Sequence, residues 1–273
     1  MAEVSFGAGQ TAVEPTPAAP TQAVAPAATN TAVGKHNPFL SDYVPSMSDV
    51  ILERINISQA LGKLKEAFAV GTLVFGRKTI LYSGPDIDLA TGTVRRAATP
   101  PAVVTFLGIT KKRYAEVVPW GSHGLLVTTE AEVAAAGGTL DFQEWDLKKK
   151  DGMKRFRPQF DFMVAIKRPD HIKDDGTVFT FDVDGSKWTI GLWMLQGPSY
   201  TAACKRVLFP EKLKGCLREG GYPSFSYKVS TRLEGHGDGK ESYVPALTVC
   251  ERNTPAFLEF ALSVTHAKPA AAE

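Results

Sequence analysis

The sequence predicts a mainly β protein of the α+β class. One domain over residues 46–262 is expected to form an antiparallel barrel or sandwich with two or three short inserted helices. About nine strand-like segments, separated by turn residues, recur along this region, whereas helix signals are few and short. The composition, 44% hydrophobic and 22% charged, is that of an ordinary globular protein. The net charge of only +2 argues against a histone-like binder of polyanions.

The two ends of the chain are expected to lie outside this domain. In the segment 11–34, 17 of 24 residues are Ala, Pro or Thr. Such a composition cannot bury enough apolar surface to offset the entropy lost on ordering. We therefore expect 1–45 to be a disordered arm and 263–273 to be a short flexible tail.

The first half of the domain reads as strands with one short helix. Alternating isoleucines predict a strand over 50–58, and a short helix follows at 60–67. Segments 70–75 and 78–82 flank Gly76-Arg77 and predict a hairpin. Residues 102–109 are apolar on both faces, which is typical of a central strand. Residues 111–118 either continue that strand or turn back.

The second half begins with a helix that starts at the capping box Thr129–Glu132 and stops at Gly137-Gly138. Asp184-Gly185 lies between alternating hydrophobic segments and predicts a two-residue hairpin turn. Gly197-Pro198-Ser199 predicts the start of another helix. The remaining predicted strands are 155–167, 179–183, 187–194, 224–233 and 242–250.

The location of the protein is constrained by what the sequence lacks. No segment predicts a membrane-spanning helix, and no secretory signal is recognised at the N-terminus. The three cysteines form no Cys-x-x-Cys pair, so neither a disulfide framework nor a zinc site is expected. A reducing cytoplasm suits this composition best.

Signals for catalysis are weak. The sequence has no Walker-type phosphate loop, no Gly-x-Ser-x-Gly and no His-Glu-x-x-His. Asp86 with Asp88, or His236 with Asp238, has the chemistry to bind a divalent metal. The alternative is that these are loop-tip polar residues beside glycines, required for turn geometry. We expect no catalytic residue, no metal and no cofactor.

Basic residues interleaved with aromatic ones are the more informative signal. Cations neutralise phosphates, and aromatic rings on a polar strand face stack on bases. Trp193 falls on the same strand face as Lys187, which suggests a stacking platform, although a helix covering that face would make it a core residue. The predicted nucleic-acid contacts are Lys112, Arg113, Tyr114, Trp120, Lys154, Arg155, Arg157, Lys187, Trp193, Lys228 and Arg232.

The segment Ile51-Leu52-Glu53-Arg54-Ile55-Asn56-Ile57-Ser58-Gln59 resembles the opening strand of phage-encoded proteins that look like single-stranded DNA-binding proteins. The pattern extends over about 50–210 and includes the strand 179–194 and the helix with Lys205-Arg206. This resemblance implies an OB-like barrel, a role in phage DNA replication or recombination, and a place in the host cytoplasm. It also implies replication or recombination proteins as partners.

The leading hypothesis is therefore a non-enzymatic protein that binds single-stranded nucleic acid through a basic groove and aromatic stacking. Oligomers are compatible with this hypothesis. A virion or assembly protein is the first alternative, because a β-rich core with an Ala/Pro/Thr-rich arm suits that role too. A metal-dependent nuclease using Asp86 and Asp88 is the second.

Overall fold

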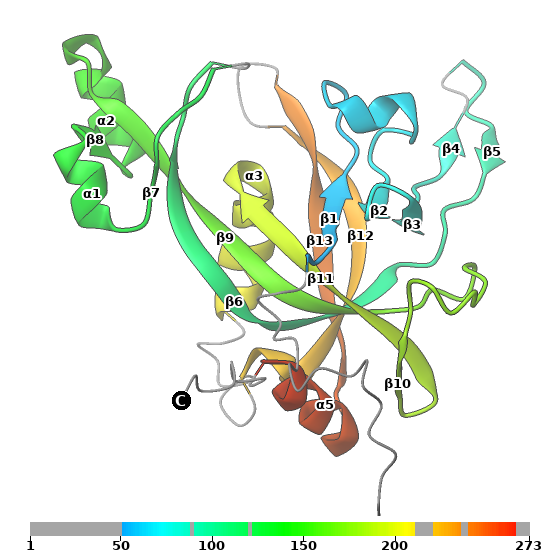
Figure 1. Ribbon diagram of the computed structural model, residues 1–273. Coiled ribbons are helices and arrows are strands. Elements are labelled where there is room, and N and C mark those ends of the chain that lie inside the picture. The colour runs from blue at the N-terminus through cyan, green and yellow to red at the C-terminus, as the bar shows by residue number, and fades with distance from the viewer. Residues whose placement is uncertain (1–50, 88–89, 120–121, 211–220, 236–239, 266–273) are drawn as a thin grey trace, which may run out of the picture. The chain divides into compact units, whose positions relative to one another are not determined.

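A curled, mostly antiparallel β-sheet is the framework of the protein, as the computed structural model shows (Figure 1). The structure describes residues 51–87, 90–119, 122–210, 221–235 and 240–265. The prediction for the arm 1–45 lies outside these residues, as do Trp120, Asp88 and the pair His236 and Asp238. The prediction of a mainly β fold is confirmed.

The main path of the sheet connects both halves of the sequence. Its order is β13 (Glu241–Arg252), β12 (Phe225–Gly235), β6 (Ala102–Glu116), β9 (Lys154–Lys167), β11 (Ser186–Gln196), β1 (Arg54–Ile57), β2 (Leu73–Phe75) and β3 (Thr79–Tyr82). The short strands β7 (Leu126–Val127), β8 (Gly138–Thr139) and β10 (Phe181–Val183) pair at its margins, and β4 (Asp86–Ile87) pairs with β5 (Val94–Arg96) separately. Along the path only β1 and β11 run parallel.

The two ends of the sheet approach each other, so the sheet forms a half-barrel. The side chain of Gln59, which follows β1, donates to the Tyr243 carbonyl at 2.7 Å and accepts from the Tyr243 amide at 2.9 Å. Thr231 on β12 donates its hydroxyl to the Gly71 carbonyl. We call the contact between these strand ends the seam.

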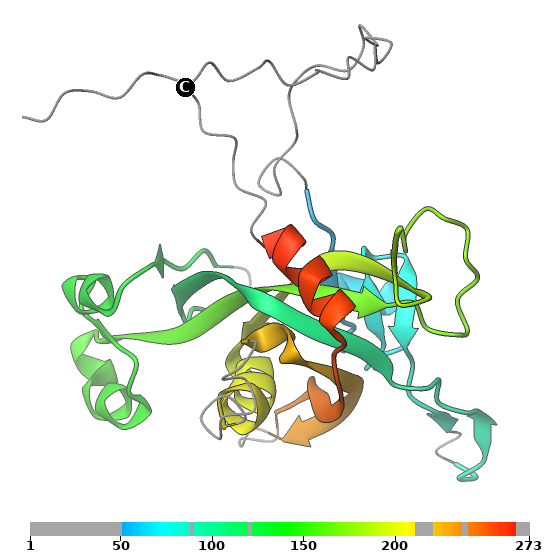
Figure 2. The same ribbon diagram turned by 90° about the horizontal axis from the view of Figure 1, so that it is seen from below.

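Each face of the sheet has its own apolar core. The concave face buries the larger core against the helical segment α3 (Gly197–Tyr200) and η3 (Thr201–Leu208), the latter a π-helix. The opposite face packs a second core on α5 (Pro255–Thr265), which Figure 2 shows across the sheet from α3 and η3. Strands β9 and β11 are therefore buried on both faces.

The predicted turn at Asp184-Gly185 is confirmed. Both residues have positive φ, 51° and 68°, and the flanking Val183 and Ser186 are paired. A two-residue turn of this type matches the twist of the strands, and glycine adopts the second position without steric cost. The question about 111–118 is also resolved, because β6 continues to Glu116.

The helices agree with the sequence in part. The capping box at Thr129 is present and starts α1 (Glu130–Ala135). The remaining short helices are η1 (Lys63–Glu66), α2 (Phe142–Lys148), η2 (Lys149–Asp151) and η4 (Tyr222–Ser224). No helix among the described residues is both long and apolar enough to cross a membrane.

The prediction that a flexible tail begins at residue 263 is wrong. The helix α5 continues to Thr265, and Val264 is only 8% exposed in the second core. An N-cap signal was present in the sequence, because Thr254 precedes Pro255 at the first helical position. The hydroxyl of Thr254 accepts from the Phe257 amide at 3.2 Å.

Candidate nucleic-acid interface

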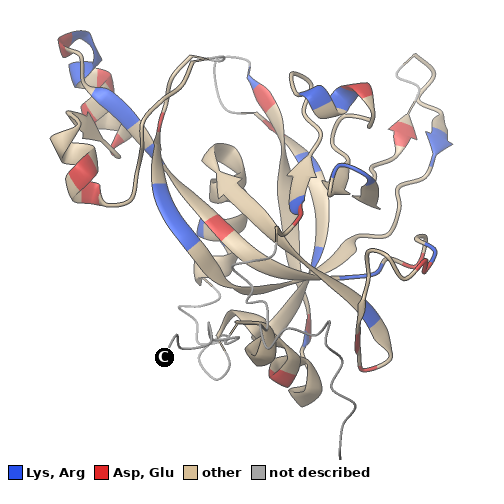
Figure 3. Ribbon diagram, viewed as in Figure 1, with Lys and Arg blue, Asp and Glu red and all other residues tan. Residues whose placement is uncertain are grey.

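The strands β6 and β9 extend beyond the rest of the sheet as a two-stranded ribbon. Pairing between β9 and β11 ends at Gln159 and Gln196, whereas β6 and β9 remain paired as far as Glu116 and Phe156. The helices α1 and α2 lie at the end of this ribbon (Figure 1). We call 111–116, 130–149 and 154–159 together the ribbon arm. Figure 3 shows basic residues on both of its strands.

The register of the ribbon divides the predicted cations between two faces. Lys112 lies opposite Phe160, and Arg113 lies opposite Gln159. Because neighbouring residues of a strand point to opposite faces, Lys112, Tyr114 and Lys154 share one face. Arg113, Arg155 and Arg157 share the other face.

On the first face, Tyr114 is a core residue. Its ring is only 3% exposed, and its hydroxyl donates to Glu130 Oε1 at 2.8 Å. Lys112 Nζ lies 5.2 Å from the centre of this ring, and a hydrogen bond with Tyr114 raises the pKa of Lys112. The prediction of Tyr114 as a nucleic-acid contact is wrong, because its ring packs with Val133 of α1 and Phe156 of β9.

On the ribbon arm, two of the predicted cations already have acidic partners. Arg113 donates from Nη2 to Asp161 Oδ2, and both side chains are largely buried. Lys154 Nζ lies 3.8 Å from Glu116 Oε1. Such pairing reduces the attraction of these two cations for a phosphate, since the carboxylates compete for the same charge.

Arg155 lies against an aromatic pair on α2. Its guanidinium carbon is 4.5 Å from the ring centre of Phe142 and 5.2 Å from that of Trp145. Lys149 Nζ approaches Trp145 from 5.3 Å. Phe142 is 52% exposed and Trp145 is half-buried. This group of four residues is the aromatic–cation cluster, with two ring surfaces close to solvent and two cations beside them.

The electrostatics of the cluster favour an anion. Among the described residues, neither Arg155 nor Arg157 has a carboxylate within ion-pair distance. The pKa of Arg155 lies below its usual value, first because partial burial desolvates the charge and then because Arg157 repels it. A bound phosphate would relieve that repulsion.

The start of α2 fixes the two aromatic side chains. Asp141 is the N-cap, and its Oδ1 accepts from the amides of Gln143 at 2.7 Å and Glu144 at 3.0 Å. Phe142 and Trp145 are three residues apart and therefore lie on one side of the helix. Their ring centres are 5.7 Å apart.

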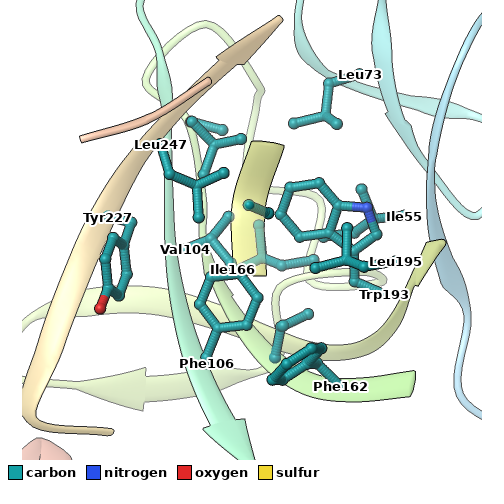
Figure 4. Close-up of a cluster of buried hydrophobic side chains, with 14 of the residues drawn as sticks. Ile55, Leu73, Val104, Phe106, Phe162, Ile166, Trp193, Leu195, Tyr227 and Leu247 are labelled. Atoms are coloured by element: carbon teal, nitrogen blue, oxygen red, sulfur yellow. The ribbon is translucent and has the colours of Figure 1, made fainter. Parts of the chain in front are cut away.

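Trp193 is a core residue, so the prediction of an exposed stacking platform there is wrong (Figure 4). Its side chain is 2% exposed and stacks on Phe106 with ring centres 5.9 Å apart. The sequence placed Trp193 on the correct face of its strand. That face, which Trp193 shares with Thr189 and Leu195, is the concave face of the sheet and packs in the core. The helical segment α3–η3 closes this face, which is the alternative that the sequence left open.

The other predicted contacts lie away from the ribbon arm. Lys187 is at the opposite end of β11 from the arm and pairs with Asp182 at 3.1 Å. Lys228 and Arg232 are exposed on β12. Ser226 lies on the same side of this strand, but it is buried, and its hydroxyl is hydrogen-bonded to that of Thr105 at 2.8 Å. The ten predicted residues within the described part of the chain therefore do not line one continuous groove.

Sequence reasoning did not include Phe142 or Trp145 among the site residues. The available signal was their helical spacing after Asp141, followed by the lysine run 148–150. The cation that completes the cluster comes from β9, and only the ribbon pairing places that strand beside α2.

No cluster of three or more His, Cys, Asp or Glu side chains that would hold a metal occurs in the described part of the chain. Cys204 packs in the concave core, and burial raises the pKa of its thiol to about 12.

Comparison of the chain with family models, with curated proteins and with solved structures gave no match.

Proposed function

We propose that this protein binds single-stranded DNA through the ribbon arm, with little preference for base sequence and without catalysing a reaction. The observation that carries the proposal is the aromatic–cation cluster, in which Arg155 lies against Phe142 and Trp145 and has no carboxylate partner among the described residues. Single-strand binders combine such rings with nearby cations, because every base has a face to stack and every nucleotide carries a phosphate.

In this mechanism the residues have separate roles. Phe142, which is half exposed, offers its ring to a base, and Arg155 and Arg157 neutralise adjacent phosphates. Lys149 adds a third charge at the end of the arm, although Asp146 pairs with it at 2.6 Å. Lys112 and Lys154 lie on the opposite face of the ribbon and extend the positive surface there.

The proposal includes the finer assignments that the sequence resemblance implies. These are an OB-like barrel, a cytoplasmic role in phage DNA replication or recombination, and partners among the proteins of those processes. The sheet curls around a helical segment in its concave face, which supports the barrel assignment. The parallel pairing of β1 with β11 can be compared with the strand pairing in OB-like barrels.

Fluorescence titration with a dT oligonucleotide at several salt concentrations tests the proposal. Each neutralised phosphate contributes a slope of roughly −0.7 in a plot of log affinity against log salt. Arg155→Ala should reduce the magnitude of the slope by about that amount. Phe142→Ala should cost about 1–3 kcal/mol of binding free energy and leave the slope unchanged.

Two further variants act as controls. Arg155→Lys keeps the charge and loses the planar contact with both rings, so it should retain the slope and lower the affinity. Lys187→Ala removes a cation from the β10–β11 hairpin, away from the ribbon arm, and should change neither the affinity nor the salt slope. Weak binding that does not respond to salt would contradict the proposal and would favour the assembly-protein alternative. Turnover that depends on added divalent metal would favour the nuclease.

A further inference from the structure

One side of β11 has a gap in its strand pairing, away from the ribbon arm. On that side, β10 pairs with β11 only as far as Trp188, and β1 begins to pair at Leu192. Between these two points no strand of the described chain lies beside 189–191, whereas β9 is paired with all three residues on the other side. The sheet is therefore interrupted next to one of its central strands.

The gap leaves the backbone of Ile190 without a hydrogen-bond partner among the described residues. The amide of Leu192 donates to the Glu53 carbonyl at 2.8 Å, toward β1. The carbonyl of Lys187 accepts from the Arg168 amide at 2.8 Å, toward β9. Because these directions alternate along a strand, the amide and carbonyl of Ile190 point into the gap.

Ile190 is only 6% exposed, so its free amide and carbonyl are unusual. Backbone groups at such low exposure are nearly always paired, since an unpaired one costs about as much as a lost hydrogen bond. No described residue bonds to either group on the gap side, from a strand or from a loop. A donor and an acceptor on one residue therefore await a binding partner.

A pocket of about 570 Å³ occupies the gap. Its lining comes from the residues that lead into β1, from the β2–β3 hairpin, from the end of the loop before β10 and from β11 itself. The lining residues that matter here are Leu52, Glu53, Phe75, Lys78, Phe181 and Ile190. This volume is within the range of small-molecule sites.

The walls of the pocket are mainly apolar and one of them is fixed. Phe75 is 2% exposed and lies against Gly191, where an added Cβ atom would come within 2.5 Å of the ring. Phe181, at the start of β10, is 39% exposed. Glu53 and Lys78 are the charged residues of the described lining, and their charges cancel. The pocket therefore suits an uncharged molecule with a flat apolar body.

We propose that the gap pocket binds a neutral heterocyclic ring that carries an amino group next to a ring nitrogen, as adenine does. The amino group donates to the Ile190 carbonyl, and the ring nitrogen accepts from the Ile190 amide, as one residue of a neighbouring strand does. A compact ring fits better than an extended peptide, because β10 and β1 occupy both ends of the gap. This inference does not rest on DNA binding by the ribbon arm.

Calorimetric titration of the full chain with adenosine, and separately with purine riboside, which lacks the amino group, tests the pocket. Wild type should bind adenosine roughly tenfold more tightly than purine riboside, because the second ligand leaves the Ile190 carbonyl unpaired. Phe181→Ala should weaken adenosine roughly tenfold by removing an apolar wall. Leu233→Ala removes an exposed apolar side chain from β12, outside the pocket, and should bind adenosine like wild type.

Amide exchange measured by NMR tests the two backbone groups without any substitution. In the free protein the amide of Ile190 should exchange faster than that of Leu192, which donates to Glu53. Saturating adenosine should slow the exchange of Ile190 and shift its amide resonance, while purine riboside, which lacks one of the two bonds, has a smaller effect.

Three results would overturn the proposal: no binding of adenosine, equal binding of purine riboside, or an Ile190 amide that exchanges no faster than that of Leu192. Competition with a dA oligonucleotide identifies the source of the ring. Displacement of adenosine by the oligonucleotide indicates a base within a strand, and simultaneous binding indicates a free nucleoside.

Discussion

Two tryptophans, Trp193 and Trp145, have different surroundings although both lie near lysines in the sequence. Trp193 is 2% exposed between Phe106 and the concave core, whereas Trp145 is half-buried at the end of the ribbon arm beside Arg155. Lysines nearby in the sequence therefore do not identify which ring can reach a base. What decides is whether a helix or solvent lies over the strand face.

Replacing Trp193 by Ala should lower the free energy of unfolding by about 3–5 kcal/mol, because the change leaves a large cavity in the concave core. Trp145→Ala is the matched control and should have a much smaller effect on stability. Chemical denaturation of both variants measures the difference. DNA affinity should show the reverse order, with Trp145→Ala weakened and folded Trp193→Ala close to wild type. Equal stability of the two variants would contradict the core assignment.

At the scale of elements, the ribbon arm depends on one short helix. The seven residues of α2 form too few hydrogen bonds to be stable alone, so the N-cap at Asp141 contributes a large part of its order. The same helix carries Phe142 and Trp145. Its stability and the geometry of the aromatic–cation cluster are thus linked.

Asp141→Ala should cost about 1 kcal/mol in helix stability and loosen both aromatic rings. Asp141→Asn keeps a capping oxygen while removing the charge, so it separates capping from electrostatics. We expect faster amide exchange in α2 and weaker oligonucleotide binding in Asp141→Ala, with near wild-type exchange in Asp141→Asn. If the two variants exchange alike, the cap does not hold the helix.

At the scale of the whole molecule, the seam joins residues that are distant in the sequence. Gln59 and Tyr243 are separated by 184 positions, yet one side-chain amide satisfies both backbone groups of Tyr243. These two hydrogen bonds take the place of backbone hydrogen bonds between strands, where the β1 end of the sheet meets β13.

Removing the amide in Gln59→Ala should lower the free energy of unfolding by about 1–3 kcal/mol, since the amide and carbonyl of Tyr243 lose their partner in a half-buried position. Gln143→Ala, an exposed position on α2, is the matched control and should change stability little. Urea denaturation of both variants measures the effect. Wild-type stability in Gln59→Ala would show that solvent replaces these bonds.

Several elements were predictable because their signals are local. The capping box at Thr129 and the turn at Asp184-Gly185 depend on residues within a few positions of each other, and both are confirmed. The strand predicted over 155–167 is present as β9, and Phe160 and Phe162, two residues apart, are both buried. The helix α5 has a comparable local signal, in Thr254 followed by Pro255.

The sequence by itself determined the mainly β class, the positions of the long strands and the residues that alternate along them, because these follow from periodicity and turn chemistry over short distances. Only the tertiary structure decided which strand faces are covered. The concave face of β11 became core because α3–η3 packs on it, and Arg155 met Phe142 because β9 passes beside α2. Burial is set by contacts between distant segments, and a strand pattern alone contains no information about what covers it.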